Sequence, residues 1–280
     1  MRTLRLGDTE VSHIRAGDFR LDGGAMFGVV PKALWTRVCP PDDLNRIPLA
    51  CNCLLVRRES ALVLVETGCG DRFAPKEREI YAVGHTTLTA SLEQVGVRPE
   101  EITHVLLTHL HFDHAAGALQ VRDGELVPTC LNALHLTQRG EWEDALAGRS
   151  VMKSSYVTRD LEALRKSARW QLLDGDEEIL PGLSVQVTGG HTPHHQAIFL
   201  RDGGRTLVYP GDVLPTRAHL SPYWIMAYDM DPFQTFVVKN ALVSQASAEN
   251  WIIAWDHDAE SEFSILRQGG RGVEAAEPDF

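Results

Sequence analysis

Short apolar runs separated by glycine, proline and charged residues recur along the chain, and most have the length of a strand. Apolar and polar positions alternate in residues 3–21 around the glycine-aspartate pairs at 7–8 and 17–18, which predicts short antiparallel strands with turns there. Residues 25–50 contain four prolines and no clear period, which predicts a long loop over the surface or over a site. Further strands are predicted at 51–57, 61–67, 102–108, 183–188, 197–200, 206–209 and 251–254.

Helices alternate with these strands. Apolar residues at helical spacing predict helices at 85–95, 114–119, 141–147, 158–168 and 233–245. The succession of strands and helices occurs twice, with a division at residue 125 or later. We therefore expect an α/β fold in which two halves each contribute a sheet with helices outside it, within one domain spanning 1–280. The polar tail, 270–280, is expected to fray.

Composition narrows the class of protein. The chain has 280 residues, 44% hydrophobic and 23% charged, which is typical of a globular protein. Its net charge of −11 disfavours a nucleic acid partner, because such partners need a basic surface. No apolar run is long enough for membrane insertion, and the N-terminus lacks the apolar core of a secretory signal. The five cysteines, an odd number, indicate reduced thiols and a cytoplasmic location.

One segment concentrates potential metal ligands. Three histidines and a carboxylate lie within six positions, directly after a predicted buried strand: His109, His111, Asp113 and His114. Neutral imidazoles suit zinc, iron and related ions, and a carboxylate offsets the charge of a second cation. The alternative is a polar loop in which Asp113 caps the following helix. Three clustered histidines favour the metal site.

A single loop cannot complete two coordination spheres, so other strand ends must contribute. His191, Asp212 and His257 each follow a predicted strand. Taken singly, His191 can be a loop histidine, Asp212 a turn residue, and His257, flanked by two aspartates, part of a surface charge cluster. Together with the His109–His114 motif, they indicate further ligands.

These motifs, in this order, resemble the metallo-β-lactamase superfamily over roughly residues 50–258. The resemblance implies a four-layer αββα sandwich with two mixed sheets and a dinuclear site at one edge. It implies two divalent ions, most commonly Zn²⁺, with Fe or Mn as alternatives. It assigns His109, His111 and His191 to one ion, Asp113, His114 and His257 to the other, and Asp212 to both. Glu66 stands where the family has an aspartate before Thr67-Gly68.

The resemblance also implies a reaction. A hydroxide held by both ions, with Asp113 and Asp212 among the catalytic residues, would attack an ester-like carbonyl or a phosphorus. No serine nucleophile is expected, and no Gly-x-Ser-x-Gly elbow is present. The metal motif, residues 141–145 and Gly211-Asp212 are similar to the branch that opens N-acyl-homoserine lactones. That branch carries a tyrosine where this chain has Pro215, so Tyr223 or His219 is a candidate replacement.

Partners and other activities stay open at this point. The aromatic and methionine-rich segment 217–232 can line an apolar pocket for the acyl chain of a small ester or lactone, or form a homodimer surface. Met26, Phe27 and Trp35 have the same two interpretations. The alternative functions are a phosphodiesterase or nuclease, a thioesterase, an oxygen-dependent iron enzyme and a non-catalytic metal-binding protein. A thioesterase of the glyoxalase II type usually has a helical C-terminal domain, for which the roughly twenty residues after His257 are too few.

Overall fold

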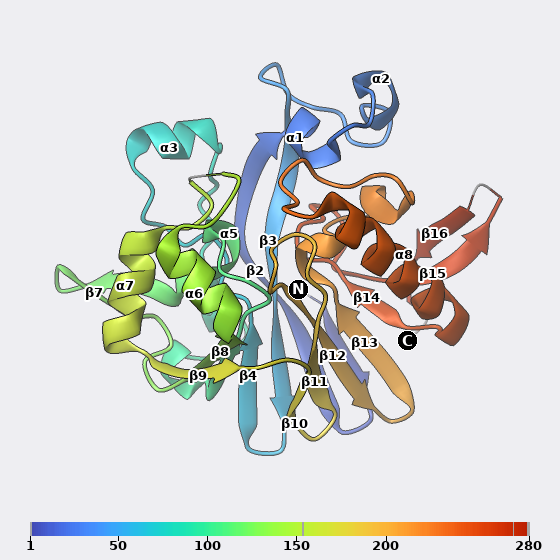
Figure 1. Ribbon diagram of the computed structural model, residues 1–280. Helices are drawn as coiled ribbons and strands as arrows, with labels where there is room; N and C mark the ends of the chain where they lie inside the picture. The colour runs from blue at the N-terminus through green and yellow to red at the C-terminus, as the bar shows by residue number, and fades with distance from the viewer. Residues whose placement is uncertain (1, 153, 271, 279–280) are drawn as a thin grey trace. The chain divides into compact units, whose positions relative to one another are not determined.

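One seven-stranded sheet lies mostly in a compact part of the chain that we call unit 1. The computed structural model describes residues 2–152, 154–270 and 272–278, and unit 1 comprises the described residues of 1–19 and 50–175. The order of this sheet is β1 (Thr3–Leu6), β2 (Thr9–Asp22), β3 (Arg46–Arg58), β4 (Ala61–Val65), β5 (His104–Leu106), β8 (Leu134–Gln138) and β9 (Arg169–Leu173) (Figure 1). It is mixed, because β1 pairs with β2 and β3 with β4 in antiparallel fashion, whereas β4, β5, β8 and β9 run parallel.

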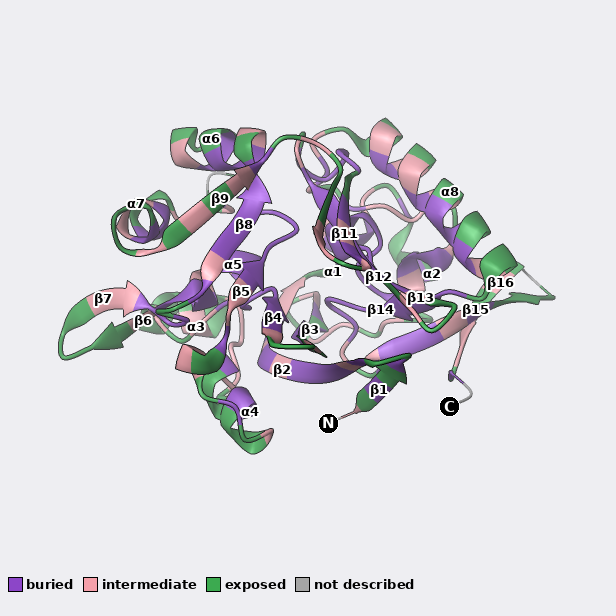
Figure 2. Cartoon of the chain, turned by 90° about the horizontal axis from the view of Figure 1, so that it is seen from below, coloured by how far each residue is buried: buried purple, intermediate pink, exposed green. Residues whose placement is uncertain are grey.

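Short helices and a hairpin complete unit 1. They are α3 (Pro75–Ile80), α4 (Leu88–Gln94), η1 (Pro99–Glu101), α5 (Phe112–Ala115), η2 (Ala116–Ala118), α6 (Arg139–Ala147), α7 (Thr158–Ser167), and the hairpin of β6 (Leu119–Arg122) with β7 (Glu125–Pro128). Helix α6 contacts β8 and β9, and α7 packs against α6 and β7. The central parallel strands are buried along most of their length (Figure 2), as expected for strands covered on both faces.

The second seven-stranded sheet lies in unit 2, the described residues of 20–49 and 176–280. Its order is β10 (Glu177–Leu180), β11 (Leu183–Val187), β12 (Gln196–Asp202), β13 (Arg205–Tyr209), β14 (Ile252–Ala254), β15 (Phe263–Gly269) and β16 (Gly272–Ala276). The helices of unit 2 are α1 (Gly23–Phe27), α2 (Lys32–Trp35), η3 (Gly211–Val213), η4 (Arg217–Leu220) and α8 (Pro232–Glu249). The sheet is mixed because β13 and β14 run parallel and its other pairs antiparallel.

Helix α8 shows how the sequence sets the core of unit 2. It begins at Pro232, with the Asp231 side chain accepting from Gln234 N–H, and ends at Asn250 in the left-handed conformation. Its buried residues recur at helical spacing, and the helix contacts β15. Leu242 and Val243 of this helix join a core cluster that contains Phe199, Trp251 and Trp255.

The predicted elements are confirmed for the most strongly patterned segments, with three corrections. The turn predicted at 17–18 is wrong, because β2 continues unbroken to Asp22. A Cβ atom at Gly17 would lie 3.1 Å from Cys69 Sγ, so this glycine serves close packing. The loop predicted at 25–50 contains α2 and parts of α1 and β3. Within the tail expected to fray, β16 pairs with β15, and Val273 packs against the core cluster; residues 271 and 279–280 lie outside the described residues.

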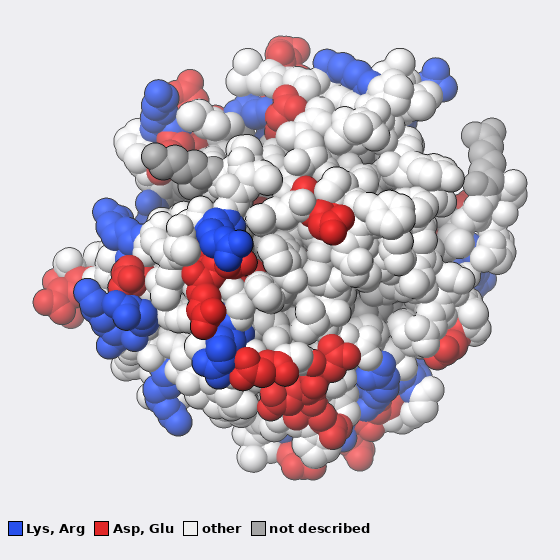
Figure 3. Space-filling view, in the orientation of Figure 1, with Lys and Arg blue, Asp and Glu red and all other residues white. Residues whose placement is uncertain are grey.

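Charge is unevenly distributed over the surface. Acidic side chains gather in the lower part of the view in Figure 3, near the position of β10 in Figure 1, and β10 itself exposes Glu177 and Glu178. Among the described residues, no helix combines the length and the apolar character needed to cross a membrane.

Candidate metal centre

The motif histidines of unit 1 converge at the end of β5. His109, His111 and His114 are all buried. The ring of His109 lies 4.5 Å from that of His111 and 4.0 Å from that of His114, between centroids. Asp113 Oδ1 lies 3.9 Å from His114 Nε2. Thus all four motif residues predicted as ligands occupy one small buried region of unit 1.

Backbone contacts hold this cluster in place. The N–H and the hydroxyl of Thr67 both donate to the carbonyl oxygen of His114, at 2.9 and 2.7 Å. Glu66, in the left-handed conformation at φ 63°, accepts from Thr108 N–H at 2.7 Å and places its second carboxylate oxygen 3.6 Å from His114 Nδ1. The longer side chain that replaces the family's aspartate therefore reaches the ring of a predicted ligand.

A second buried acid supports the motif from α6. Glu141 accepts from Leu110 N–H at 3.0 Å and from the hydroxyl of Tyr156 at 2.8 Å. The Tyr156 ring lies 4.8 Å from the His111 ring. The segment 141–145 was noted only for its resemblance to the family, and this contact gives Glu141 a physical role. The role of Tyr156 had no signal in the sequence.

In unit 2, Asp212 lies between two histidines. Its Oδ2 is 3.0 Å from His191 Nε2, and its Oδ1 is 3.1 Å from His257 Nε2. Asp212 belongs to η3, directly after β13, and all three side chains are buried. Asp212 thus offers a different carboxylate oxygen to each of two imidazoles.

The surroundings of His191 fix its ring. His191 Nδ1 lies 2.9 Å from Asp229 Oδ1, and the adjacent Met230 N–H donates to the carbonyl oxygen of His191. A carboxylate at Nδ1 sets the tautomer and leaves Nε2 for an ion. Gly190, at φ +87°, is required here, because a Cβ atom would lie 2.5 Å from Thr235 Oγ1. Sequence reasoning missed Asp229, since nothing local marks a contact over 38 positions.

Pro215 contacts a predicted ligand residue through its backbone. The carbonyl oxygen of Pro215, where the lactonase-like branch carries a tyrosine, accepts from His257 N–H at 3.1 Å. The acids that flank His257 were weighed as a surface charge cluster, but Asp256, His257 and Asp258 are all buried. The ligand atoms of Asp212, Asp256 and His257 all lie within 4.8 Å of one another. Asp256 was absent from the predicted ligand set.

The carboxylates around His191 favour the protonated, positively charged form of its ring. Burial lowers the pKa of His191, but Asp212 and Asp229 outweigh this effect and raise it to about 10. Burial in turn raises the pKa of Asp229. A cation bound at His191 Nε2 takes the place of a proton there, so ion binding is expected to release protons. Clustered imidazoles and carboxylates with buried donor atoms fit a divalent metal ion.

The two other predicted catalytic residues occupy different environments. His219 is buried, with Nε2 2.8 Å from the Met26 carbonyl oxygen and Nδ1 2.8 Å from Thr216 Oγ1. The Phe27 ring stacks on it at 4.9 Å. Tyr223 is 72% exposed and stacks on Phe236. These contacts favour a structural role for His219 and a surface role for Tyr223.

A buried lysine forms hydrogen bonds to the backbone of the segment 217–232. Lys239 Nζ, on α8, donates to the carbonyl oxygens of His219, Ser221 and Trp224, at 3.0, 2.9 and 2.6 Å. Burial lowers the pKa of Lys239 to about 8. Phe27 packs edge-on against Trp224 and stacks on Trp35 at 5.3 Å. Met26, Phe27 and Trp35 are core residues of unit 2, which removes them from a dimer surface.

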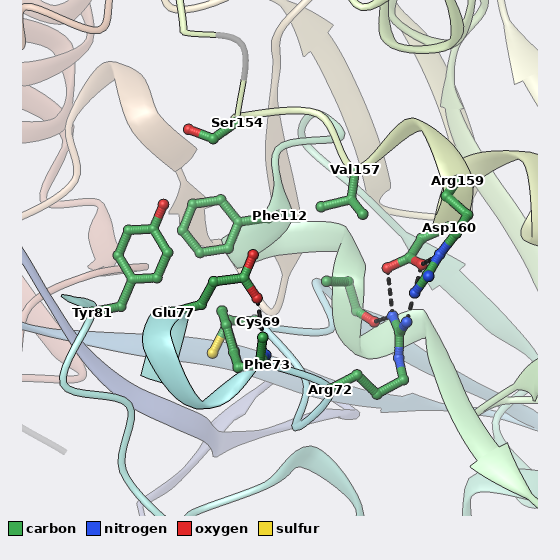
Figure 4. Close-up of a pocket in the computed structure, with 12 residues that line it drawn as sticks. Cys69, Arg72, Phe73, Glu77, Tyr81, Phe112, Ser154, Val157, Arg159 and Asp160 are labelled. Atoms are coloured by element: carbon green, nitrogen blue, oxygen red, sulfur yellow. Dashed lines mark hydrogen bonds and ion pairs between the residues drawn. The ribbon is translucent and has the colours of Figure 1, made fainter. Parts of the chain in front are cut away.

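A cavity of about 420 Å³ lies in unit 1 beside the histidine motif. Figure 4 shows Phe73, Tyr81 and Phe112 grouped on one side of it, and the pair of Arg72 with Asp160 on the other. The Phe112 ring lies 6.3 Å from that of Phe73 and 5.2 Å from that of Tyr81. Because Phe112 lies between His111 and Asp113 in sequence, this aromatic wall adjoins the predicted ligands.

The sheets, the ordered motifs and the histidine-carboxylate groups together define the class of protein. A sequence model of the metallo-beta-lactamase superfamily matches residues 46–257, and the chain belongs to this superfamily. It is a metallohydrolase by class, and its His and Asp groups are suited to divalent metal ions.

Particular relatives agree with this assignment. The N-acyl homoserine lactonase AiiA of Bacillus thuringiensis subsp. kurstaki is 26% identical over 242 residues, which cover 80% of this chain and 86% of the relative. A probable metal-dependent hydrolase from Staphylococcus aureus is 28% identical in structure-based comparison, with a TM-score of 0.88 and 99% of both chains covered. AidC, a dizinc quorum-quenching lactonase, has a TM-score of 0.80 at 19% identity, covering 100% of this chain and 97% of AidC. The predicted fold class, with two mixed sheets and helices, is confirmed.

Proposed function

We propose that this chain is a dinuclear metallohydrolase that opens ester or lactone bonds, with N-acyl-homoserine lactones as candidate substrates. The observation that carries the proposal is Asp212, whose two oxygens face His191 and His257 at 3.0 and 3.1 Å. The similarity to AiiA supports the choice of substrate. We further propose that both units form one catalytic domain, since the superfamily match spans parts of both.

The proposed ligand set comprises the seven residues that the sequence predicts as ligands. In it His109, His111 and His191 bind one ion, Asp113, His114 and His257 bind the other, and Asp212 binds both. Divalent ions bound there would supply Lewis acidity and lower the pKa of coordinated water. Zn²⁺ is the first candidate, because imidazoles are a preferred zinc donor and AidC is a dizinc enzyme. Fe and Mn are the alternatives to test.

The protein's own residues position the reactants. Asp229 fixes the His191 ring, Glu141 anchors the loop at Leu110, and Thr67 anchors His114. We assign the apolar part of the substrate to the cavity beside Phe112, because its aromatic wall can bury an acyl chain. The net charge of −11 disfavours a nucleic acid substrate.

Proton release tests the proposal. The metal-reconstituted protein is mixed with a long-chain N-acyl-homoserine lactone, and Asp212→Ala is the control. Ring opening yields a carboxylic acid, so rapid release that depends on Asp212 is expected. Release at the same rate from the variant would refute the bridging role of Asp212. No release from either protein would reject this lactone and direct the assay to thioesters and phosphoesters.

The compartment and the oligomeric state of the protein are also proposals. All five cysteines are free thiols, which supports a reducing, cytoplasmic compartment. The homodimer stays a prediction, and the exposed rings of Tyr223 and Phe233 are the first surface residues to substitute. Light scattering that shows a monomer at all concentrations would end that prediction.

A further inference from the structure

Asp256 is a buried acid that the proposed ligand set does not use. It follows β14 and Trp255, and its side chain is 1% exposed. Asp256 Oδ2 lies 4.0 Å from His257 Nε2, and Asp212 Oδ1 lies 3.1 Å from the same nitrogen. Both carboxylates thus approach the nitrogen of His257 that would carry an ion.

We propose that Asp256 is an additional carboxylate ligand of the ion bound by His257 and Asp212. The inference rests on the proposed dinuclear centre. Two donor atoms that each lie about 2.1 Å from one ion are at most about 4.2 Å apart. The separations of 3.1 and 4.0 Å from His257 Nε2 both satisfy this limit. A separation of 4.0 Å is too long for a direct hydrogen bond between Asp256 Oδ2 and His257 Nε2.

The neighbouring acid, Asp258, makes contacts that define a structural role. Asp258 accepts from the N–H groups of Glu260 and Ser261 and forms a two-pronged pair with Arg217. Its oxygens are therefore committed to a turn and an ion pair. Asp258 and Asp256 are both buried within two positions of each other, which makes Asp258 a matched control.

An additional carboxylate changes which ion the site prefers. Carboxylate oxygens suit harder ions such as Mn²⁺, whereas imidazoles suit Zn²⁺ and Fe²⁺. Two carboxylates beside His257 also add negative charge, which a divalent cation offsets in a buried region. Asp256 should therefore strengthen the binding of Mn²⁺ more than that of Zn²⁺.

The experiment compares wild type, Asp256→Asn and Asp258→Asn. Each protein is freed of metal, and the binding of Mn²⁺ alone and Zn²⁺ alone is measured by calorimetry, with the bound metal counted after dialysis. Asp256→Asn should weaken Mn²⁺ binding at one of two sites at least about tenfold, and Zn²⁺ binding less. Asp258→Asn should bind both ions as wild type does and unfold at a lower urea concentration.

The outcomes separate this inference from the proposed function. If wild type binds two ions and Asp256→Asn binds them with unchanged affinity and preference, Asp256 is not a ligand, while the dinuclear centre stands. If wild type binds no metal, the proposed function fails and this inference fails with it. If Asp256→Asn does not fold, judged by circular dichroism, Asp256→Ser is measured against the same criterion.

Discussion

The acid sensitivity of unit 2 depends in part on one buried imidazole, His219. A carbonyl oxygen only accepts hydrogen bonds, so His219 Nε2 carries a hydrogen toward Met26 O, and Nδ1 accepts from the hydroxyl of Thr216. Burial lowers the pKa of His219 from its ordinary value of 6.5 to about 4, and Lys239 acts in the same direction. Protonation in the folded state therefore breaks the contact with Thr216.

The sign and size of the effect follow from these values. Between pH 6.5 and 4 the unfolded chain binds a proton at His219 that the folded chain does not bind. The stabilisation is thus complete above pH 6.5 and is lost as the pH falls toward 4. A difference of about 2.5 pKa units corresponds to about 3 kcal/mol of unfolding free energy. His219→Gln removes the titration, while its amide can still donate to Met26 O and accept from Thr216.

Urea unfolding of the metal-free protein from about pH 7 to about pH 4 measures this difference. Wild type should lose about 3 kcal/mol more unfolding free energy over this range than His219→Gln does. Contributions from the metal ligands are common to both proteins and cancel in the comparison. The control is His85→Gln at an exposed position, which should follow the wild-type curve. Parallel curves for wild type and His219→Gln would refute the reasoning.

Three further substitutions test other contacts. Asp229→Ala removes the acceptor at His191 Nδ1 and should weaken metal binding about 10–100-fold, as measured by competition with a chelator. Unchanged metal affinity would exclude a role for Asp229 in positioning the His191 ring. Gly117→Ala places a Cβ atom 2.0 Å from Thr67 O and should lower the unfolding free energy in urea by about 1–3 kcal/mol. Equal stability of the variant and the wild type would contradict the close approach of Gly117 to Thr67. Lys239→Met leaves three buried carbonyl oxygens without their donor and should lower the unfolding free energy in urea by about 1–3 kcal/mol. A more stable variant would show that the cost of burying the lysine charge exceeds the gain from its hydrogen bonds.

Strongly patterned elements could be predicted from the sequence. Strand β4 is a nearly continuous apolar run, and α8 has helical spacing with Pro232 at its start. Strands β15 and β16 were missed, because their stability comes from pairing with each other and with β14 rather than from a local pattern. Gly17 was interpreted as a turn because a sequence does not show which side chains will pack against a glycine.

Some residues of the candidate metal centre could also be predicted from a local pattern, whereas others come together only on folding. The His109–His114 motif is local, so its chemistry is visible in the sequence. Asp229 reaches His191 only through folding, and no local spacing could have identified it. A surface charge cluster was the alternative weighed for the Asp-His-Asp run at 256–258, yet the fold buries all three residues. The supporting acids of a metal centre are thus harder to predict than its motif.

The proposed dinuclear centre binds one pair of metal ions, with His111 and His191 as ligands of the same ion. Metal stoichiometry after dialysis tests it most directly in wild type, His111→Ala, His191→Ala and the double variant. Because the account places His111 and His191 on the same ion, wild type should bind two ions and each single variant one. The double variant should still bind one. If the double variant binds none, or if the single variants both retain two ions, the two histidines do not share an ion and the account is contradicted.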